Sequence, residues 1–161
     1  DLLFVRLRGA VAAVEAACHK MLAEQSGKRM DNAQAQGDWA QCRDQRLPFF
    51  ARPADPMLAL WRISVAQTAP AFIGLPWPQL VEWHGGLRWL WAPVDASAQL
   101  HALAAQHGGS ASIFIAPQSA LTGARGHFSI SSPAQLAIQQ RLKHSLDPHG
   151  IFNPQRLFPA W

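Results

Sequence analysis

The chain has 161 residues, of which 49% are hydrophobic and 15% charged, and its formal net charge is +4. This length suits one domain that buries a core without a disulfide or a metal. The basic residues are scattered, which argues against a nucleic-acid surface, and no apolar run is long enough to span a bilayer. The two cysteines, Cys18 and Cys42, lie far apart, which argues against a metal site and a disulfide framework.

The first third of the chain predicts one strand and two helices. Leu2–Leu7 alternates like a strand, and since the chain starts within it, we expect a piece of a longer protein. Ala10–Gln25 predicts a helix, and Gly37–Gln45 predicts a shorter one. The first helix carries an apolar stripe at helical spacing, which we expect to be buried: Val11, Val14, Cys18, Met21 and Leu22.

The middle of the chain predicts a strand, a loop and a hairpin. Leu58–Ala66 alternates like a strand, and Thr68–Pro78 contains three prolines and a glycine, typical of a loop. The run Q-L-V-E-W-H-G-G-L-R-W-L-W predicts two strands joined at Gly85-Gly86. A two-residue turn there places Trp83 opposite Arg88, as a cross-strand cation–π pair.

The last third predicts a helix over Asp95–His107, a strand over Ser110–Ala116, and a final helix over Pro133–Leu146. The tail Leu146–Pro159 follows. Its Asp-Pro, His-Gly and Asn-Pro pairs predict turns around an apolar plug, Ile151-Phe152, so we expect this tail to dock on another surface.

This order of elements predicts an α+β fold: a ferredoxin-like antiparallel sheet with helices packed on one face. Such a sheet leaves its other face for a ligand or a partner. Arg6 and Arg62 are expected on that face, and Arg88 is a candidate third member. Three guanidinium groups suit a small carboxylate, although solvated arginines on an exposed face are an equally good interpretation.

The hairpin leaves one question open. Its alternation does not decide whether Glu82 and His84, or Trp83 and Arg88, lie on the free face. His84 is either a hydrogen-bonded structural histidine or a catalytic base. The seven histidines are dispersed, and we expect no metal site.

Several motifs carry a resemblance. The run R-L-K-H-S-L-D-P-H-G-I-F-N-P-Q-R-L-F-P resembles the carboxyl end of FAD-linked oxidases of the vanillyl-alcohol-oxidase type, with Gln155 where that family has Gly. Together with L-F-V-R-L-R-G-A-V-A-A-V-E-A-A-C, P-F-F, L-W-R-I-S-V and Q-L-V-E-W-H-G-G-L-R-W-L, it resembles the FAD-binding subunit of bacterial glycolate oxidase over nearly the whole chain.

This resemblance implies that residues 1–161 are the carboxyl-terminal domain of a larger flavoprotein, whose amino-terminal domain holds most of the FAD. The implied reaction is oxidation of glycolate, a 2-hydroxy acid, to glyoxylate with FAD as acceptor, and the isolated chain is expected to be inactive. The alternative is a non-catalytic assembly module. Implied partners are a sister flavin subunit and an iron–sulfur subunit, in the cytoplasm or peripherally at the inner membrane through the complex.

The resemblance also suggests site residues. Phe152, Asn153 and Arg156 match the family tail and would lie nearest the flavin, and Arg62, His84 and Arg88 are catalytic candidates. In these sites an Arg binds the substrate carboxylate and a base removes a proton; the base is not assigned. Without the flavin domain, we expect the tail from Asn153 onward to be partly unsupported.

Overall fold

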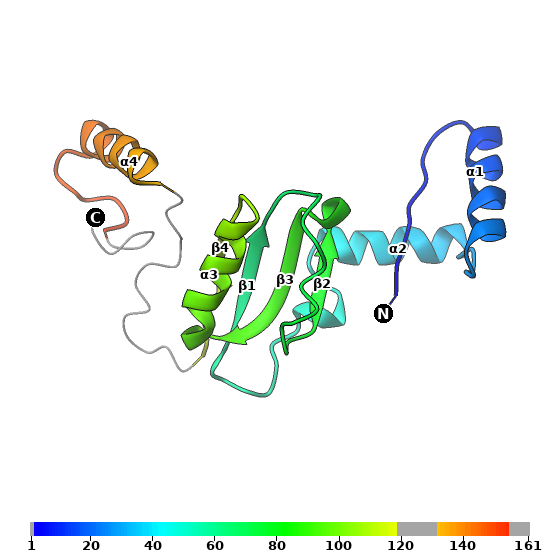
Figure 1. Ribbon diagram of the computed structural model, residues 1–161, viewed down its shortest axis with the longest axis horizontal. Helices are drawn as coiled ribbons and strands as arrows, with labels where there is room; N and C mark the ends of the chain where they lie inside the picture. Colours follow the sequence, from blue (N-terminus) through cyan, green and yellow to red (C-terminus); the bar gives the residue numbers. More distant parts are fainter. Residues whose placement is uncertain (1, 119–131, 155–161) are drawn as a thin grey trace. The chain divides into compact units, whose positions relative to one another are not determined.

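A computed structural model describes residues 2–118 and 132–154 of the chain (Figure 1). The chain divides into two compact units, Asp1–Ala51 and Arg52–Trp161, and each is described by itself.

The first unit contains helix α1 (Val11–Glu24), helix α2 (Asn32–Arg43) and a 3-10 turn at Pro48–Phe50. Helix α2 begins five residues earlier than Gly37 because the Asp31 carboxylate accepts hydrogen bonds from the backbone N–H groups of Ala33 and Gln34, at 2.9 and 3.1 Å. Neither helix contains a buried residue, so the prediction of a buried stripe on α1 is wrong for this unit.

The predicted strand at Leu2–Leu7 is wrong. Residues 2–8 have no regular secondary structure, and Leu2 and Leu3 are each 87% exposed. An apolar run with strand propensity forms a strand only when another strand pairs with it, and none in the described part of the chain does so. The Arg6 guanidinium instead lies over the Trp39 ring, 5.6 Å from its centroid.

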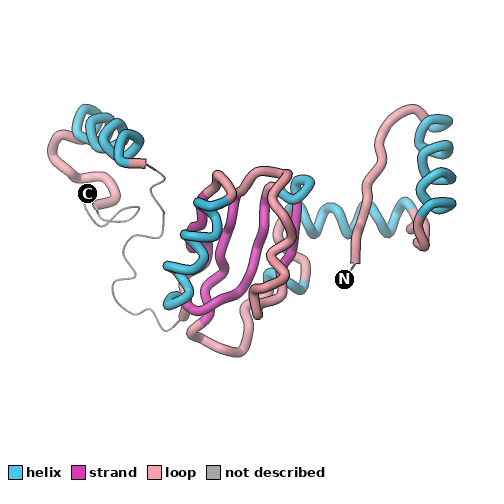
Figure 2. Tube along the Cα trace, viewed as in Figure 1, coloured by secondary structure: helices cyan, strands magenta, loops and turns pink. Residues whose placement is uncertain are grey.

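The second unit is built on a four-stranded antiparallel sheet in the order β2-β3-β1-β4 (Figures 1 and 2). Helix α3 (Ser97–Gln106) connects β3 to β4 and packs against β4 and β1. This strand order, with a helical crossover, confirms the predicted ferredoxin-like α+β class. The connection from β1 to β2 is irregular rather than helical. The strands are β1 (Leu58–Ser64), β2 (Gln79–Glu82), β3 (Leu87–Pro93) and β4 (Ser110–Ile115).

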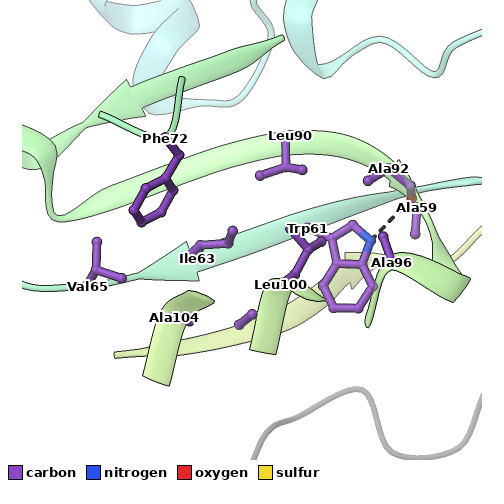
Figure 3. Packing of buried hydrophobic residues seen from close by; sticks show 11 residues of the cluster. Ala59, Trp61, Ile63, Val65, Phe72, Leu90, Ala92, Ala96, Leu100 and Ala104 are labelled. Carbon is purple, nitrogen blue, oxygen red and sulfur yellow. Dashed lines mark hydrogen bonds between the residues drawn. The ribbon is translucent and has the colours of Figure 1, made fainter. Parts of the chain in front are cut away.

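The hydrophobic core lies between α3, the sheet and the β1–β2 connection (Figure 3). Trp61 on β1 is 1% exposed, and its indole Nε1 donates to the backbone carbonyl of Ala92 on β3, at 3.2 Å. This bond satisfies the polar atom of a large buried ring. The cluster consists of Ala59, Trp61, Ile63, Val65, Phe72, Leu90, Ala92, Ala96, Leu100, Ala104 and Ala111.

The β2–β3 hairpin forms, but its predicted register is wrong by two residues. Val81, not Trp83, lies opposite Arg88, because β2 ends at Glu82 and four residues make the connection. Gly86, with a φ of −78°, does not supply the positive φ of a two-residue turn, and its carbonyl accepts from the Val65 N–H at 2.9 Å. A Cβ there would lie 3.4 Å from the Val65 oxygen.

Helix α4 (Pro133–Leu146) has the predicted bounds. The Ser132 hydroxyl caps it by accepting from the Gln135 N–H at 3.1 Å, and Pro133 occupies the first turn, where its missing N–H costs nothing.

Candidate functional site

Arg62 lies on the sheet face that α3 does not cover, as predicted. In the register it is flanked by Trp89 on β3 and Ser112 on β4. It is half-buried, and within the described residues its side chain forms no hydrogen bond or ion pair. A half-buried guanidinium without a partner among the described residues suits an anionic ligand, because its N–H donors are available for hydrogen bonds.

Two aromatic side chains share this face with Arg62: Trp89, its neighbour in the register, and Phe114 of β4. The rings of Trp89 and Phe114 meet edge to face, with centroids 5.0 Å apart, and the Trp89 Nε1 donates to the Glu82 carboxylate at 2.7 Å. The centre of this face is not open, since Leu60 is fully buried and Trp89 is 2% exposed. The face predicted to be left for a ligand or a partner is therefore not open at its centre, whereas Phe114 on the edge strand is 49% exposed.

Arg88 lies on the opposite face, beside Ile63 of the core, and is 2% exposed. Its guanidinium donates to the carbonyls of Gly85 at 3.1 Å, Pro70 at 2.7 Å and Ala69 at 2.9 Å. Burial lowers the pKa of Arg88. The Arg88 guanidinium is thus occupied by backbone carbonyls of other residues in the chain. The structure does not bring it to the face that carries Arg62.

His84 is exposed in the β2–β3 connection and not on a strand. Its φ is 53° and that of the preceding Trp83 is 51°, so two consecutive residues with side chains have left-handed backbone. Such conformations are uncommon outside glycine and often mark functional turns. The register decides which hairpin residues lie on the face that α3 does not cover. Glu82 lies on that face with Arg62 and Trp89, whereas Val81 lies on the core face with Arg88.

The tail after α4 is organised by Asp147, which the sequence indicated only as a helix stop. Its carboxylate accepts from the backbone N–H groups of Ile151 and Phe152, each at 2.9 Å. Lys143, one turn earlier on α4, forms an ion pair with the same carboxylate and donates to the Phe152 carbonyl at 2.6 Å. The spacing K-x-x-x-D at the helix end is the sequence signal that could have revealed this arrangement.

These contacts lower the pKa of the Asp147 carboxyl to about 2, with the Lys143 hydrogen bond as the largest cause and the two backbone N–H groups adding to it. Of the predicted cofactor-binding residues, Phe152 is 66% exposed and Asn153 has a φ of 48°. Arg156 lies outside the described residues. The expectation of an unsupported tail also falls largely outside them, since only Asn153 and Pro154 of that segment are described.

A cofactor the size of FAD needs a long cleft with donors for its phosphates. Among the described residues, a cavity of about 570 Å³ lies at the ends of β1 and α3. It is lined by Ser64–Ala66, Ala105 and Gly108–Ser110, without a charged side chain. These residues do not fit a pyrophosphate site. Among residues 2–118 and 132–154, no group of three His, Cys, Asp or Glu side chains is placed to hold a metal. No helix there is long and apolar enough to cross a membrane.

The sheet, its crossover helix and the half-buried Arg62 define a ferredoxin-like α+β domain with a candidate carboxylate-binding face. Over 156 residues, 97% of its length, the chain is 36% identical to the glycolate oxidase subunit GlcE of Escherichia coli (strain K12). This comparison confirms the resemblance to a bacterial glycolate oxidase subunit. The chain spans 39% of the length of that relative. No family model and no solved structure matches the chain.

Proposed function

We propose that this chain is the carboxyl-terminal domain of a flavoprotein subunit of a glycolate oxidase complex, which oxidises glycolate to glyoxylate. The observation that carries the proposal is the 36% identity, over nearly the whole chain, to a protein named as a glycolate oxidase subunit. FAD is the electron acceptor of this reaction, and a domain outside this chain makes most of the contacts with FAD. The proposed partners are a sister flavin subunit and an iron–sulfur subunit, in the cytoplasm or peripherally at the inner membrane through the complex.

Arg62 is the residue that we assign to the substrate carboxylate. A guanidinium forms two parallel hydrogen bonds with a carboxylate, and the buried Trp89 beside Arg62 in the register leaves less water on that side to weaken such a pair. His84 stays a candidate base, since it is exposed and free to approach a ligand. Arg88, the third candidate, does not contact the substrate in this proposal. It positions the two connections whose backbone carbonyls it binds. Phe152, Asn153 and Arg156 remain the proposed contacts on the flavin side.

The test uses the full-length protein assembled with its partner subunits, comparing Arg62→Met, Arg62→Lys and the control Arg8→Met, which changes an exposed arginine. We expect Arg62→Met to raise KM for glycolate about tenfold or more, in line with loss of a charge-assisted bidentate contact, with the flavin spectrum unchanged. Arg62→Lys should restore part of the loss, and Arg8→Met should have no effect. Wild-type protein without a flavin spectrum or glycolate oxidation would overturn the proposed function.

The alternative is a non-catalytic assembly module that contacts the other oxidase subunits. It is favoured by Trp83, which is 70% exposed in a turn held in an uncommon backbone conformation. Exposed tryptophans are enriched at the centres of protein interfaces. Size-exclusion chromatography with the sister subunits distinguishes the two functions: if Trp83→Ala abolishes co-elution while Arg62→Met leaves KM unchanged, the assembly function is correct.

A further inference from the structure

The turn after α4 combines a fixed backbone with outward apolar side chains. We define the Asp147 turn as residues 147–152. Its carboxylate accepts two backbone N–H groups, and the Gly150 N–H donates to the Asp147 carbonyl at 3.1 Å. Lys143 closes the arrangement by contacting both the carboxylate and the Phe152 carbonyl. Five backbone groups from Asp147 to Phe152 are thus satisfied by the turn and Lys143, which favours this conformation over others.

The Asp147 carboxylate is shielded from water, with only 6% of the side chain exposed, and Lys143 beside it is 22% exposed. Charge-assisted hydrogen bonds to a shielded carboxylate are stronger than neutral ones in water. A helix stop needs none of this, since Pro148, directly after the C-cap residue, already prevents the helix from continuing. The Lys143–Asp147 ion pair therefore stabilises the conformation of the turn rather than the end of the helix.

The side chains that the turn presents are not covered by the described residues. Ile151 is 68% exposed and Phe152 is 66% exposed. Three apolar residues of α4, spaced by four and thus on one helix face, are exposed as well: Ile138, Leu142 and Leu146. Large apolar side chains gathered on a short segment mark a surface that another protein segment covers.

We propose that Asp147 is a positioning residue, which orients Ile151 and Phe152 to dock on the part of the full-length protein that lies outside this chain. The inference rests on the proposed function. The chain spans 39% of the length of its relative, so the larger share of such a protein is available to cover the turn. A second copy of the chain, or another subunit, is the competing occupant.

The test places a photo-crosslinking phenylalanine analogue at Phe152 of the full-length protein and maps the crosslinked peptide. We expect the crosslink to reach the same polypeptide outside residues 1–161. Asp147→Asn and Lys143→Met should each lower its yield about fivefold or more, and Lys143→Arg should restore it. The matched control Asp95→Asn, which changes an exposed carboxylate, should keep the wild-type yield.

Hydrogen exchange of the peptide covering residues 147–154 reports the turn itself and needs no activity. We expect Asp147→Asn to speed exchange of the Ile151 and Phe152 amides about tenfold or more. Crosslinks to a second copy, to another subunit or within residues 1–161 would overturn the assigned occupant, and unchanged exchange would overturn the role of Asp147. Wild-type protein that lacks flavin would overturn the proposed function alone, because both readouts here are independent of flavin.

Discussion

The Arg88 guanidinium stacks on the ring of Phe72, with its central carbon 3.8 Å from the ring centroid. The same group donates to the carbonyls of Ala69, Pro70 and Gly85. One side chain of β3 therefore fixes both the β1–β2 connection and the β2–β3 connection. A buried cation is tolerated here because backbone carbonyls and an aromatic face, rather than a carboxylate, compensate its charge.

Replacing Arg88 by Met leaves three carbonyl oxygens without their donor and removes the cation–π contact. We expect the free energy of unfolding to fall by about 3 kcal/mol. Urea denaturation followed by Trp fluorescence measures it. Arg62→Met is the matched control and should change it by less than about 1 kcal/mol, because Arg62 forms no hydrogen bond with the described residues. Equal effects of the two substitutions would contradict the structural role of Arg88.

Gly109 lies against the end of β1, where a Cβ would be 1.9 Å from the Ser64 carbonyl oxygen and 2.8 Å from the Val65 Cα. Both atoms belong to the backbone of a strand and cannot move aside. Gly109→Ala should therefore destabilise the fold by about 3 kcal/mol or more. In the control Gly37→Ala, the new methyl group meets nothing within 4 Å inside α2, so stability should rise by up to about 1 kcal/mol. Thermal melting of the two variants makes the comparison.

His101 on α3 has a buried Nε2 without a hydrogen-bond partner among the described residues and packs edge to face on Trp61, with centroids 5.7 Å apart. Burial lowers its pKa below the ordinary 6.5. The unfolded chain thus binds the proton more readily, and stability falls as the pH drops below about 6.5, until the folded pKa is reached. His101→Phe should flatten the fall in urea midpoint between pH 7 and pH 5. The exposed His19→Gln should keep the wild-type slope.

The pKa of the Asp147 carboxyl is about 2 instead of the ordinary 3.8, and it predicts the pH at which the Asp147 turn loses its hydrogen bonds. A depressed carboxyl pKa contributes stability that is fully present above pH 3.8 and is lost as the pH falls through 2. The amide chemical shifts of Ile151 and Phe152 should consequently titrate near pH 2, and Asp147→Asn should abolish that titration. A midpoint near pH 4 would mean that the carboxylate is not held as described.

Local patterns predicted the elements whose signals lie within their own residues. Helix α4 was predicted to the residue because Ser132-Pro133 and Asp147-Pro148 mark both of its ends. The strands β1 and β4 were predicted within two residues from alternation, which also placed Arg62 opposite the core face.

Features that depend on contacts between distant residues were not predictable from these patterns. The strand expected at Leu2–Leu7 has no pairing partner in the described structure, and the four-residue connection of the hairpin places Val81, not Trp83, opposite Arg88. Arg88 looked like a ligand-binding group because its partners are carbonyls 18 and 19 residues away, and carbonyls have no sequence signature. Asp147 was missed because a Lys–Asp pair four residues apart is common on solvated helices.

The position of β1 in the sheet has a consequence for synthesis of the protein. Both of its neighbours, β3 and β4, follow it in the chain, and about 50 residues separate the end of β1 from the end of β4. At roughly 5–20 residues per second, the ribosome needs about 3–10 s to complete that distance. Until β3 and then β4 have been synthesised, β1 has at least one unpaired edge, so nascent chains of this length are the ones we expect ribosome-associated chaperones to bind.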